Sequence, residues 1–400
     1  MAVYNSSVNT ITPSTTNNQM RDVSDKVREL YAQDAPILAL VEKTDPTTGQ
    51  PGGGAGIIKK RAVKGMKYEY FSYTPLAVSF DVASGSGLSP VLADVTGLLP
   101  GMTIMNIETR EVGIIDAINS GTKTLTVVAI SSSFTSAVGN HLLTMAPAYK
   151  EGSTNPEVLA KDEDNLYNYL QPVRFAVEIA ISAKGNPNYT GDYFAKLKNR
   201  RFIEGKQALE YTMLFGERSS SGDTTSTANR GSVYTTRGAE KWALAAYDSG
   251  GAMSPEKMYT DMILAMGDFV GDNDSLIMVG GKHIFGDIMG WYNGKVQIPQ
   301  GKYEKLGVKC SKFDTLGPEL TYIKHRAYSL AGNQNRALIF NPDDYEYVYK
   351  EGLDIKPALD IQPNDSHTKK DEIYGYVGFA DKSGGRTSMV VYNWGARGAI

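Results

Sequence analysis

Cysteine is nearly absent from the 400-residue chain, which contains only Cys310. One cysteine excludes an internal disulfide framework and any metal site that needs several thiolates. Histidine is scarce as well: His141, His283, His325 and His367 lie far apart, and none belongs to an H-E-x-x-H pair that would place two imidazoles on one helix face. We therefore expect no zinc site and predict no cofactor.

Long apolar runs and a strong charge of either sign are also missing. No run of about eighteen apolar residues occurs, and the start MAVYNSSVNTITPSTTNN lacks the basic and apolar regions of an export signal. We expect a soluble chain that does not enter a membrane. The 41 Lys and Arg against 44 Asp and Glu give a net charge of -3, which argues against a strongly basic nucleic-acid-binding domain. The length predicts two or three domains with a sizeable core.

Two short stretches resemble catalytic motifs without the partners that the chemistry needs. GGKH at residues 280–283 lacks the first glycine and the final hydroxyl of a phosphate loop, so a strand-to-helix turn is the better interpretation. DSGG at residues 248–251 occurs around the nucleophile of serine proteases, but His141 is the only histidine upstream of it. We predict no enzyme activity. A hydrolase that uses Ser249 is kept as an alternative, which a fluorophosphonate label would test.

The first segment of the chain reads as an arm. A stretch rich in Ser, Thr and Asn, through about residue 18, is too polar to pack by itself. Apolar residues at helical spacing follow from Met20 to Leu30, and Pro36 limits this helix. The glycine-rich residues 49–56 then predict a flexible joint.

Residues 57–76 alternate as a strand does. Tyr68 and Tyr70 fall on one side, whereas Phe71 and Tyr73 fall on the other. Because both sides carry aromatic residues, we expect both to be covered.

Residues 77–147 have a different texture. Short runs such as MTIMNI and TLTVVAI are separated by turn sequences such as NSGTK every ten or so residues. This pattern predicts an all-β unit of about seventy residues. The chain after it resumes the earlier style, which indicates an insertion.

DYFAKLKNRRFIEGKQALEYTMLFG, residues 192–216, predicts a long helix with Thr190 or Asp192 as its cap and Gly216 at its end. Its apolar residues form several short patches instead of the single stripe of a helix packed on one core. Many charged residues lie between these patches. We therefore expect the helix to contact several different surfaces.

The remainder of the chain mixes helix and strand. MSPEKMYTDMILAMGDFVG predicts a helix with Ser254 as N-cap and Gly271 at its end. SLIMVGGKHIFGDIMG predicts a strand, a turn and a helix, and the segments from residue 308 onward are mostly β. The sequence as a whole predicts an α+β protein with one large insertion.

The order of these parts resembles that of the major capsid proteins of tailed bacteriophages with the Hong Kong 97-type fold. The similarity covers about 320 residues and excludes most of residues 77–147. It extends from the arm helix, through the descending strand and the long helix with its E-x-x-x-L-x-G ending, to VYTTRGAEKW and SLIMVGGKHIFGDIMGWYN. The residues that carry it are Ala35, Pro36, Ile37, Leu38, Glu151, Gly152, Asn168, Tyr169, Gln171, Glu210, Leu214 and Gly216.

This resemblance implies a fold with a long spine helix, an extended β-hairpin loop and, here, an all-β insertion domain. It also implies the division of the chain into an N-terminal arm (1–55), an extended loop (56–76 and 148–173), the insertion (77–147), a peripheral domain (174–253 and 371–400, with the spine helix at 192–215) and an axial domain (254–370).

The function that the resemblance implies is structural. Copies of the chain would assemble in the host cytoplasm as hexamers and pentamers of an icosahedral head that encloses double-stranded DNA. The DNA would be contacted non-specifically on the inner face, and decoration, scaffold and portal proteins are further candidate partners. A β-rich adhesion protein of a virion or cell surface is the alternative.

Charged residues supply the candidate contacts between subunits. A basic cluster lies within nine residues, an acidic trio lies on the return from the same loop, and two arginines lie in the long helix. We expect the basic and acidic groups to pair within the hairpin or across to a neighbour. These residues are Lys59, Lys60, Arg61, Lys64 and Lys67; Asp162, Glu163 and Asp164; and Arg200 and Arg201.

Overall fold

The structure is a computed structural model. It describes residues 35–41, 57–152, 159–185, 192–223, 232–251, 253–258, 266, 269–270, 274–291, 310–313 and 318–395. The chain forms two compact units, one of them Phe71–Asn165 and the other comprising the rest. The helix expected from Met20 to Leu30 and the polar stretch before it lie outside the described residues.

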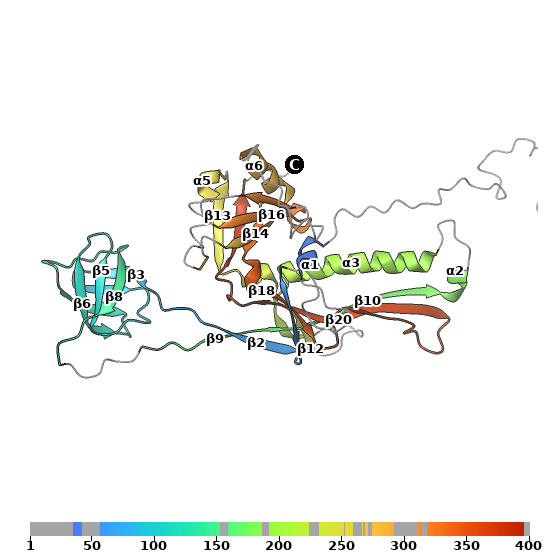
Figure 1. Cartoon of the computed structure of the whole chain (residues 1–400), viewed down its shortest axis with the longest axis horizontal. Helices are drawn as coiled ribbons and strands as arrows, with labels where there is room; N and C mark the ends of the chain where they lie inside the picture. Colours follow the sequence, from blue (N-terminus) through green and yellow to red (C-terminus); the bar gives the residue numbers. More distant parts are fainter. Residues whose placement is uncertain are drawn as a thin grey trace, which may run out of the picture. The chain divides into compact units, whose positions relative to one another are not determined.

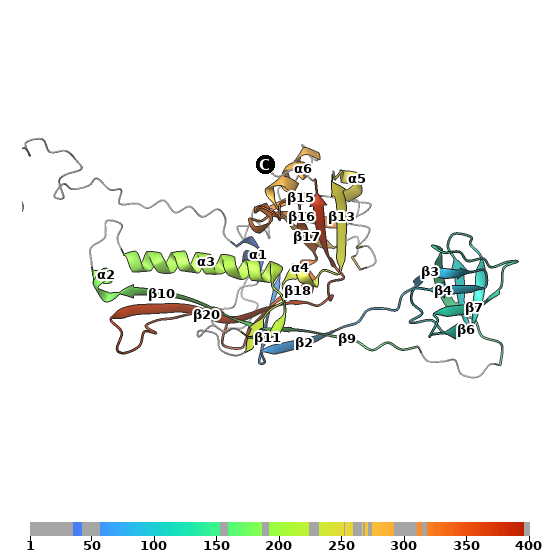
Figure 2. The same cartoon turned by 180° about the vertical axis from the view of Figure 1, so that it is seen from behind.

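A mixed sheet and a long helix make up one part of the larger unit. The sheet has the order β1-β18-β20-β10, with β1 parallel to β18, the other pairs antiparallel, and β19 added to β20. Helix α3 lies along β10 and β20 (Figures 1 and 2). The elements are β1 (Lys59–Val63), β10 (Gln171–Ala180), α3 (Tyr193–Phe215), β18 (Tyr345–Lys350), β19 (Lys356–Ala358) and β20 (Thr368–Asp381).

A six-stranded sheet makes up the other part of this unit, in the order β13-β21-β17-β14-β16-β15. Alternate residues of its central strand serve two cores: Ile277 and Val279 join Leu209 and Met213 of α3, whereas Met278 joins a second cluster with helix α6. The elements are β13 (Ala245–Gly251), α5 (Pro255–Lys257), β14 (Ser275–Gly280), α6 (Lys282–Trp291), β15 (Cys310–Phe313), β16 (Glu319–Lys324), β17 (Ala337–Phe340) and β21 (Ser388–Trp394).

Helix α3 begins and ends within one residue of the predicted limits. Asp192 is its N-cap and accepts hydrogen bonds from the backbone N–H groups of Phe194 and Ala195 at 3.0 and 3.1 Å. Burial is concentrated in its last turns, around Leu209 and Leu214. Phe194 is also buried, in the first turn. The short apolar patches of the sequence thus correspond to buried positions at both ends of the helix, with exposed and half-buried residues between them.

The smaller unit contains a closed barrel with the strand order β3-β4-β7-β6-β5-β8 (Figure 1). Its core consists of inward-facing residues such as Phe80, Ile115, Leu125 and Leu142. The barrel occupies the segment for which the sequence predicts an all-β unit. Its strands are β3 (Ser79–Ser86), β4 (Ser89–Leu92), β5 (Met102–Asn106), β6 (Val112–Asn119), β7 (Thr124–Ala129) and β8 (His141–Pro147).

The remaining elements are short. Two strand pairs, β2-β9 and β11-β12, form separate two-stranded sheets. The elements are α1 (Pro36–Leu40), β2 (Lys67–Ser72), β9 (Asp164–Tyr169), α2 (Ile181–Gly185), β11 (Ser219–Asp223), β12 (Ser232–Thr235), α4 (Ala239–Trp242), η3 (Ala327–Ser329) and η4 (Pro342–Asp344).

The structure corrects the expectation of one continuous strand over residues 57–76. An exposed turn at residues 64–65 separates β1 from β2, and the two strands join different sheets. The reason is packing: Tyr68 of β2 is buried, and its hydroxyl donates to the carbonyl oxygen of Phe379 at 2.9 Å. The aromatic residues on the opposite side are not covered by this chain, since Phe71 is 65% exposed and Tyr73 is 60% exposed.

Each large sheet combines strands from distant parts of the chain. Strands β1, β18 and β19 belong to the sheet that contains β20 and β10, whereas β13 and β21 lie in the six-stranded sheet. The division of the chain into an arm, a loop, an insertion, a peripheral domain and an axial domain stays a prediction.

The helix predicted from Ser254 to Gly271 is described only at its start. The Ser254 hydroxyl accepts from the backbone N–H of Lys257 at 3.2 Å, as expected of an N-cap. Helix α5 itself ends at Lys257, and most of residues 259–273 lie outside the described part of the chain.

Candidate subunit-contact surface

Lys60 of the predicted basic cluster is committed to its own chain. Its side chain is 11% exposed and forms an ion pair with Asp354. The ammonium also lies 5.2 and 5.1 Å from the ring centroids of Tyr347 and Tyr349. A half-buried cation with a carboxylate and two aromatic faces around it holds β1 against β18, so it is not available to a neighbour.

Arg61 and Lys67 have intramolecular partners but remain partly exposed. The guanidinium of Arg61 lies 3.9 Å from Glu346, a carboxylate that also pairs with Lys382. Lys67 pairs with Glu69, and this hydrogen bond raises the pKa of Lys67 above its usual value. Such exposed pairs contribute little to stability.

Lys59 and Lys64 are exposed as well, at the start of β1 and in the turn after it. Of the acidic trio, Asp162 and Glu163 are exposed in the chain that leads into β9. Asp164 accepts from the Thr74 hydroxyl at 3.1 Å and lies 3.9 Å from the ammonium of Lys161.

The ion pairs described above join the basic cluster to Asp354, Glu346 and Glu69. Pairing of this cluster with the acidic trio, within the hairpin or across two copies of the chain, stays a prediction.

Helix α3 presents a positively charged surface that includes the two candidate arginines. Between Tyr193 and Phe215 it has five Lys or Arg and two Glu, and one of the latter, Glu210, is buried. Arg201 pairs with Glu204 at 3.1 Å and lies 5.6 Å from the ring centroid of Phe175. Arg200 is half-buried on the same helix.

The resemblances to catalytic motifs have structural explanations. The Ser249 side chain is buried, and its hydroxyl lies 3.4 Å from the carbonyl oxygens of Gly251 and Tyr392, so backbone carbonyls orient it. The glycine at position 281 joins β14 to α6, and an added Cβ would lie 2.1 Å from the carbonyl oxygen of Tyr328. This glycine is explained by close packing.

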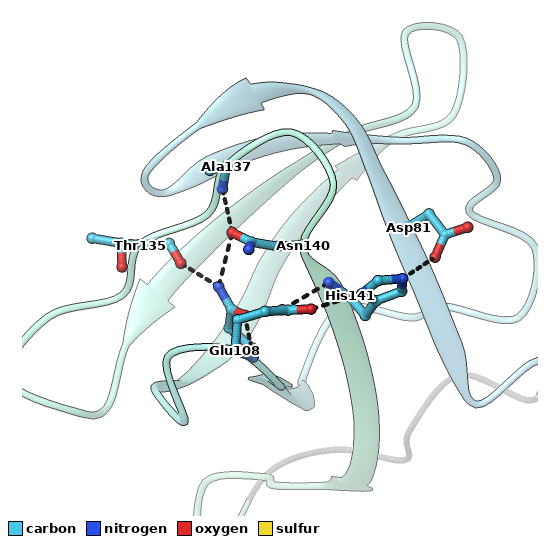
Figure 3. Close-up of polar contacts among 7 residues, drawn as sticks. Asp81, Glu108, Thr135, Ala137, Asn140 and His141 are labelled. Carbon is cyan, nitrogen blue, oxygen red and sulfur yellow. Dashed lines mark hydrogen bonds and ion pairs between the residues drawn. The ribbon is translucent and has the colours of Figure 1, made fainter.

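A histidine held by two carboxylates, which the sequence did not single out as a site, lies on the barrel (Figure 3). Glu108 accepts from the backbone N–H of His141 at 2.9 Å and contacts its Nδ1 at 2.6 Å, while Asp81 lies 3.5 Å from Nε2. The Glu108 hydrogen bond raises the pKa of His141. Nearby, the Asn106 amide donates to the carbonyl oxygen of Thr135 at 2.7 Å, which holds the loop before β8 in place.

Asp81 lies directly opposite His141 in the pairing of β3 with β8, which explains why these two side chains of the triad are close. No sequence pattern brings Glu108 to it, because that contact depends on the closure of the barrel. All three side chains are partly or largely exposed, so the triad is a surface ion network that adds little stability.

A second set that the sequence did not single out is the buried pair of Glu210 and His325, at 3.2 Å. The sequence feature that could have indicated this pair is Glu210 itself, a charged residue among the apolar Leu209, Met213 and Leu214 near the end of α3.

Among the residues that the structure describes, no group of three or more His, Cys, Asp or Glu is arranged to hold a metal ion. No described helix has the length and apolar character to cross a membrane.

Comparison with known proteins identifies capsid proteins. The solved cyanophage A-1(L) capsid is similar to this chain with a TM-score of 0.52 and 10% identity over 96% of this chain and 99% of that one. At this identity the likeness shows the fold alone. The capsid of the native GTA particle gives a TM-score of 0.47 at 11% identity, covering 98% of this chain and 100% of that one. The capsid of Myoviridae phage XM1 gives 0.46 at 8% identity, covering 93% and 96%.

The likeness to the cyanophage A-1(L) capsid indicates a fold shared with a phage capsid protein. No curated protein matches the chain. The model of one family, described as SU10 major capsid protein, matches residues 7–380. The chain therefore belongs to the SU10 major capsid protein family.

Proposed function

We propose that this structural protein of the phage head assembles as hexamers and pentamers into an icosahedral shell around double-stranded DNA. The family match over residues 7–380 carries the proposal, and the homo-oligomeric shell of the virion follows from the family. The adhesion-protein alternative is not favoured. Electron microscopy of the expressed protein tests the proposal: closed shells are expected, whereas only monomers would contradict it.

The described elements suggest a role for each part. We assign α3 as the spine helix, the β2-β9 pair with its flanking chain as the extended loop, and the barrel as an insertion on the outer side of the shell. The exposed Phe71 and Tyr73 support the assignment of the loop, because aromatic residues left open by one subunit suit a surface that a neighbour covers.

Assembly in the host cytoplasm, non-specific contact with packaged DNA on the inner face, and contacts with scaffold, portal and decoration proteins complete the proposal. The family is structural, and we assign no catalysis to the chain. A fluorophosphonate label is expected to leave Ser249 unmodified, because its hydroxyl is buried against backbone carbonyls.

Charge reversal at Asp162 and Glu163 should reduce assembly and leave the subunit folded. Both residues are exposed, so their replacement with lysine removes no core contact. Each exposed ion pair contributes only about 0–1 kcal/mol, but the same contact is repeated by every subunit of a shell. We expect a lower yield of sedimenting particles at low salt, and a smaller difference at high salt because of screening.

The complementary reversal uses Lys59 and Lys64, since Lys60 holds the subunit's own sheet. Changing both to glutamate in the double-lysine variant should partly restore the yield. Asp116→Lys, an exposed change on barrel strand β6, is the control. The changes at Lys59 and Lys64 made alone should reduce the yield as well. A normal yield from the acidic reversal alone and from the basic reversal alone would contradict the proposed pairing.

Removal of the barrel should leave a folded subunit. The barrel closes all its strands on one another and has its own core, so it does not contribute strands to either large sheet. We expect a variant in which a short Gly/Ser linker joins Leu76 to Ala148 to be soluble, with an unchanged circular dichroism melting transition for the remaining unit. If this variant is insoluble and point mutations in the barrel also unfold the whole subunit, the larger unit does not fold independently of the barrel.

A further inference from the structure

A single buried carboxylate connects three distant parts of the larger unit. Glu210, on α3, is 1% exposed. Its Oε1 accepts from the backbone N–H of Ile37 at 2.6 Å and lies 3.2 Å from Nε2 of His325. Burial of a carboxylate without such partners would be strongly unfavourable. The contacts with Ile37 and His325 therefore accompany the burial of Glu210.

The tautomer of His325 follows from its second contact. Its Nδ1 accepts the backbone N–H of Ala327 at 3.1 Å, so Nδ1 has no proton and the proton of the neutral ring is on Nε2, directed at Glu210. The rings of Tyr211 and Tyr328 lie edge-on to the imidazole, at centroid distances of 6.0 and 6.2 Å. The backbone N–H of His325 donates to the carbonyl oxygen of Gly280 at 2.9 Å, which ties this end of the pair to strand β14.

The other end of the connection is the segment at residues 35–41. Helix α1 has no side-chain cap at Ala35, and Pro36 has no N–H. The first N–H group of the helix is that of Ile37, and its acceptor is Glu210 of α3. At its far end, the carbonyl oxygen of Leu40 accepts from Ile57 and Ile58 at 2.8 and 3.0 Å. The segment is therefore anchored separately at each end.

We infer that Glu210 is a positioning residue: with His325 it fixes residues 35–41 on the long helix. Each subunit of a shell must present this segment in the same place if the same contacts are to repeat. That consequence for assembly rests on the proposed shell function, whereas the anchoring itself does not.

Hydrogen exchange of unassembled subunits, read by mass spectrometry for a peptide that contains Ile37, tests the anchoring. In the wild-type protein this amide should be protected. Glu210→Gln should make its exchange about tenfold faster, because a neutral acceptor replaces a charged one. Glu204→Gln, an exposed change on the same helix, should have no effect at this amide.

Changes at His325 separate positioning from general packing. His325→Leu removes the donor and should speed exchange at Ile37, whereas His325→Gln keeps an N–H donor and should restore protection. Rapid exchange at Ile37 in the wild type, or unchanged exchange in both Glu210→Gln and His325→Leu, would overturn the anchoring, even if other variants fail to fold.

Particle yield by sedimentation of the same variants tests the consequence for assembly. Fast exchange at Ile37 should accompany a reduced yield, and fast exchange with a normal yield would overturn the assembly role alone. Absence of particles from the wild-type protein would count against the proposed shell function and would leave the exchange result standing.

Discussion

Replacement of Gly385 with alanine should leave almost no stably folded subunit. Gly385 has a φ of +91°, and an added Cβ would lie 1.8 Å from the carbonyl oxygen of Trp242. The obstacle is backbone and cannot rotate away, and the backbone of Leu244 donates to the Gly385 carbonyl at 3.1 Å. We expect a loss of more than about 4 kcal/mol in the free energy of unfolding, measured by urea denaturation or by the loss of soluble protein.

Gly332 provides a matched control for this prediction. Its φ of +89° is nearly the same, but an added Cβ would meet nothing within 4 Å. Gly332→Ala should therefore cost only the backbone strain, about 1–2 kcal/mol. If both variants lose the same stability, crowding against Trp242 is not the reason that glycine occupies position 385.

Local patterns were sufficient to predict the elements whose stabilising contacts are close in sequence. The N-cap at Asp192 lies within three residues of the N–H groups that it satisfies, and α3 follows from it. The strand, turn and helix around Gly281 are likewise local, since the apolar run of β14 and the helical spacing of α6 meet at that glycine. The turn sequences of residues 77–147 similarly predicted short strands.

What the sequence could not predict depends on contacts between distant positions. Lys60 looked like a surface charge, yet its partner Asp354 is 294 positions away and is brought to it by the parallel pairing of β1 with β18. Glu210 and Ile37 are 173 positions apart. Periodicity describes which face of an element is buried, but it does not say what lies against that face.

This limit matters most for the candidate contact surface. Charges that are adjacent in sequence were grouped as one cluster, and the fold separates them into a sheet-holding lysine, partly exposed ion pairs and two open lysines. Lys60 and Arg61 have partners within the subunit, and this distinguishes them from Lys59 and Lys64, which are exposed. The same holds for Phe71 and Tyr73, whose exposure is meaningful because Tyr68 and Tyr70 are buried on the other side.

Asp381, at the end of β20, should make the stability of the subunit fall as the pH rises. The side chain is fully buried, and its Oδ1 accepts from the backbone N–H and the hydroxyl of Ser383 at 2.9 and 2.6 Å. Desolvation raises the pKa of this carboxyl to about 6, against the lowering effect of the hydrogen bonds from Ser383, and the nearby charge of Asp344 adds to the increase.

The sign of the effect follows from the raised pKa. Because the folded protein holds this proton more tightly than the unfolded chain does, the contribution of Asp381 to stability is fully present below about pH 4. It is lost as the pH rises to about 6, and above that the folded state contains a buried anion. A pKa that is about 2 higher in the folded protein than in the unfolded chain corresponds to about 3 kcal/mol in the free energy of unfolding.

Asp381→Asn should therefore be more stable than the wild type at pH 8, by about 2–3 kcal/mol, and no more stable at pH 4. The amide is neutral at both pH values and keeps an oxygen acceptor for Ser383. Urea unfolding of unassembled subunits at pH 4, 6 and 8, followed by tryptophan fluorescence, measures the difference. Glu372→Gln, in the same unit as the three tryptophans, is the control with the opposite sign, since the hydrogen bond from Arg174 lowers the pKa of Glu372. Its contribution is lost only as the pH falls below about 4.5, so this change should not alter the slope between pH 6 and 8. An equal gain or loss from Asp381→Asn at all three pH values would show that Asp381 does not titrate in this range.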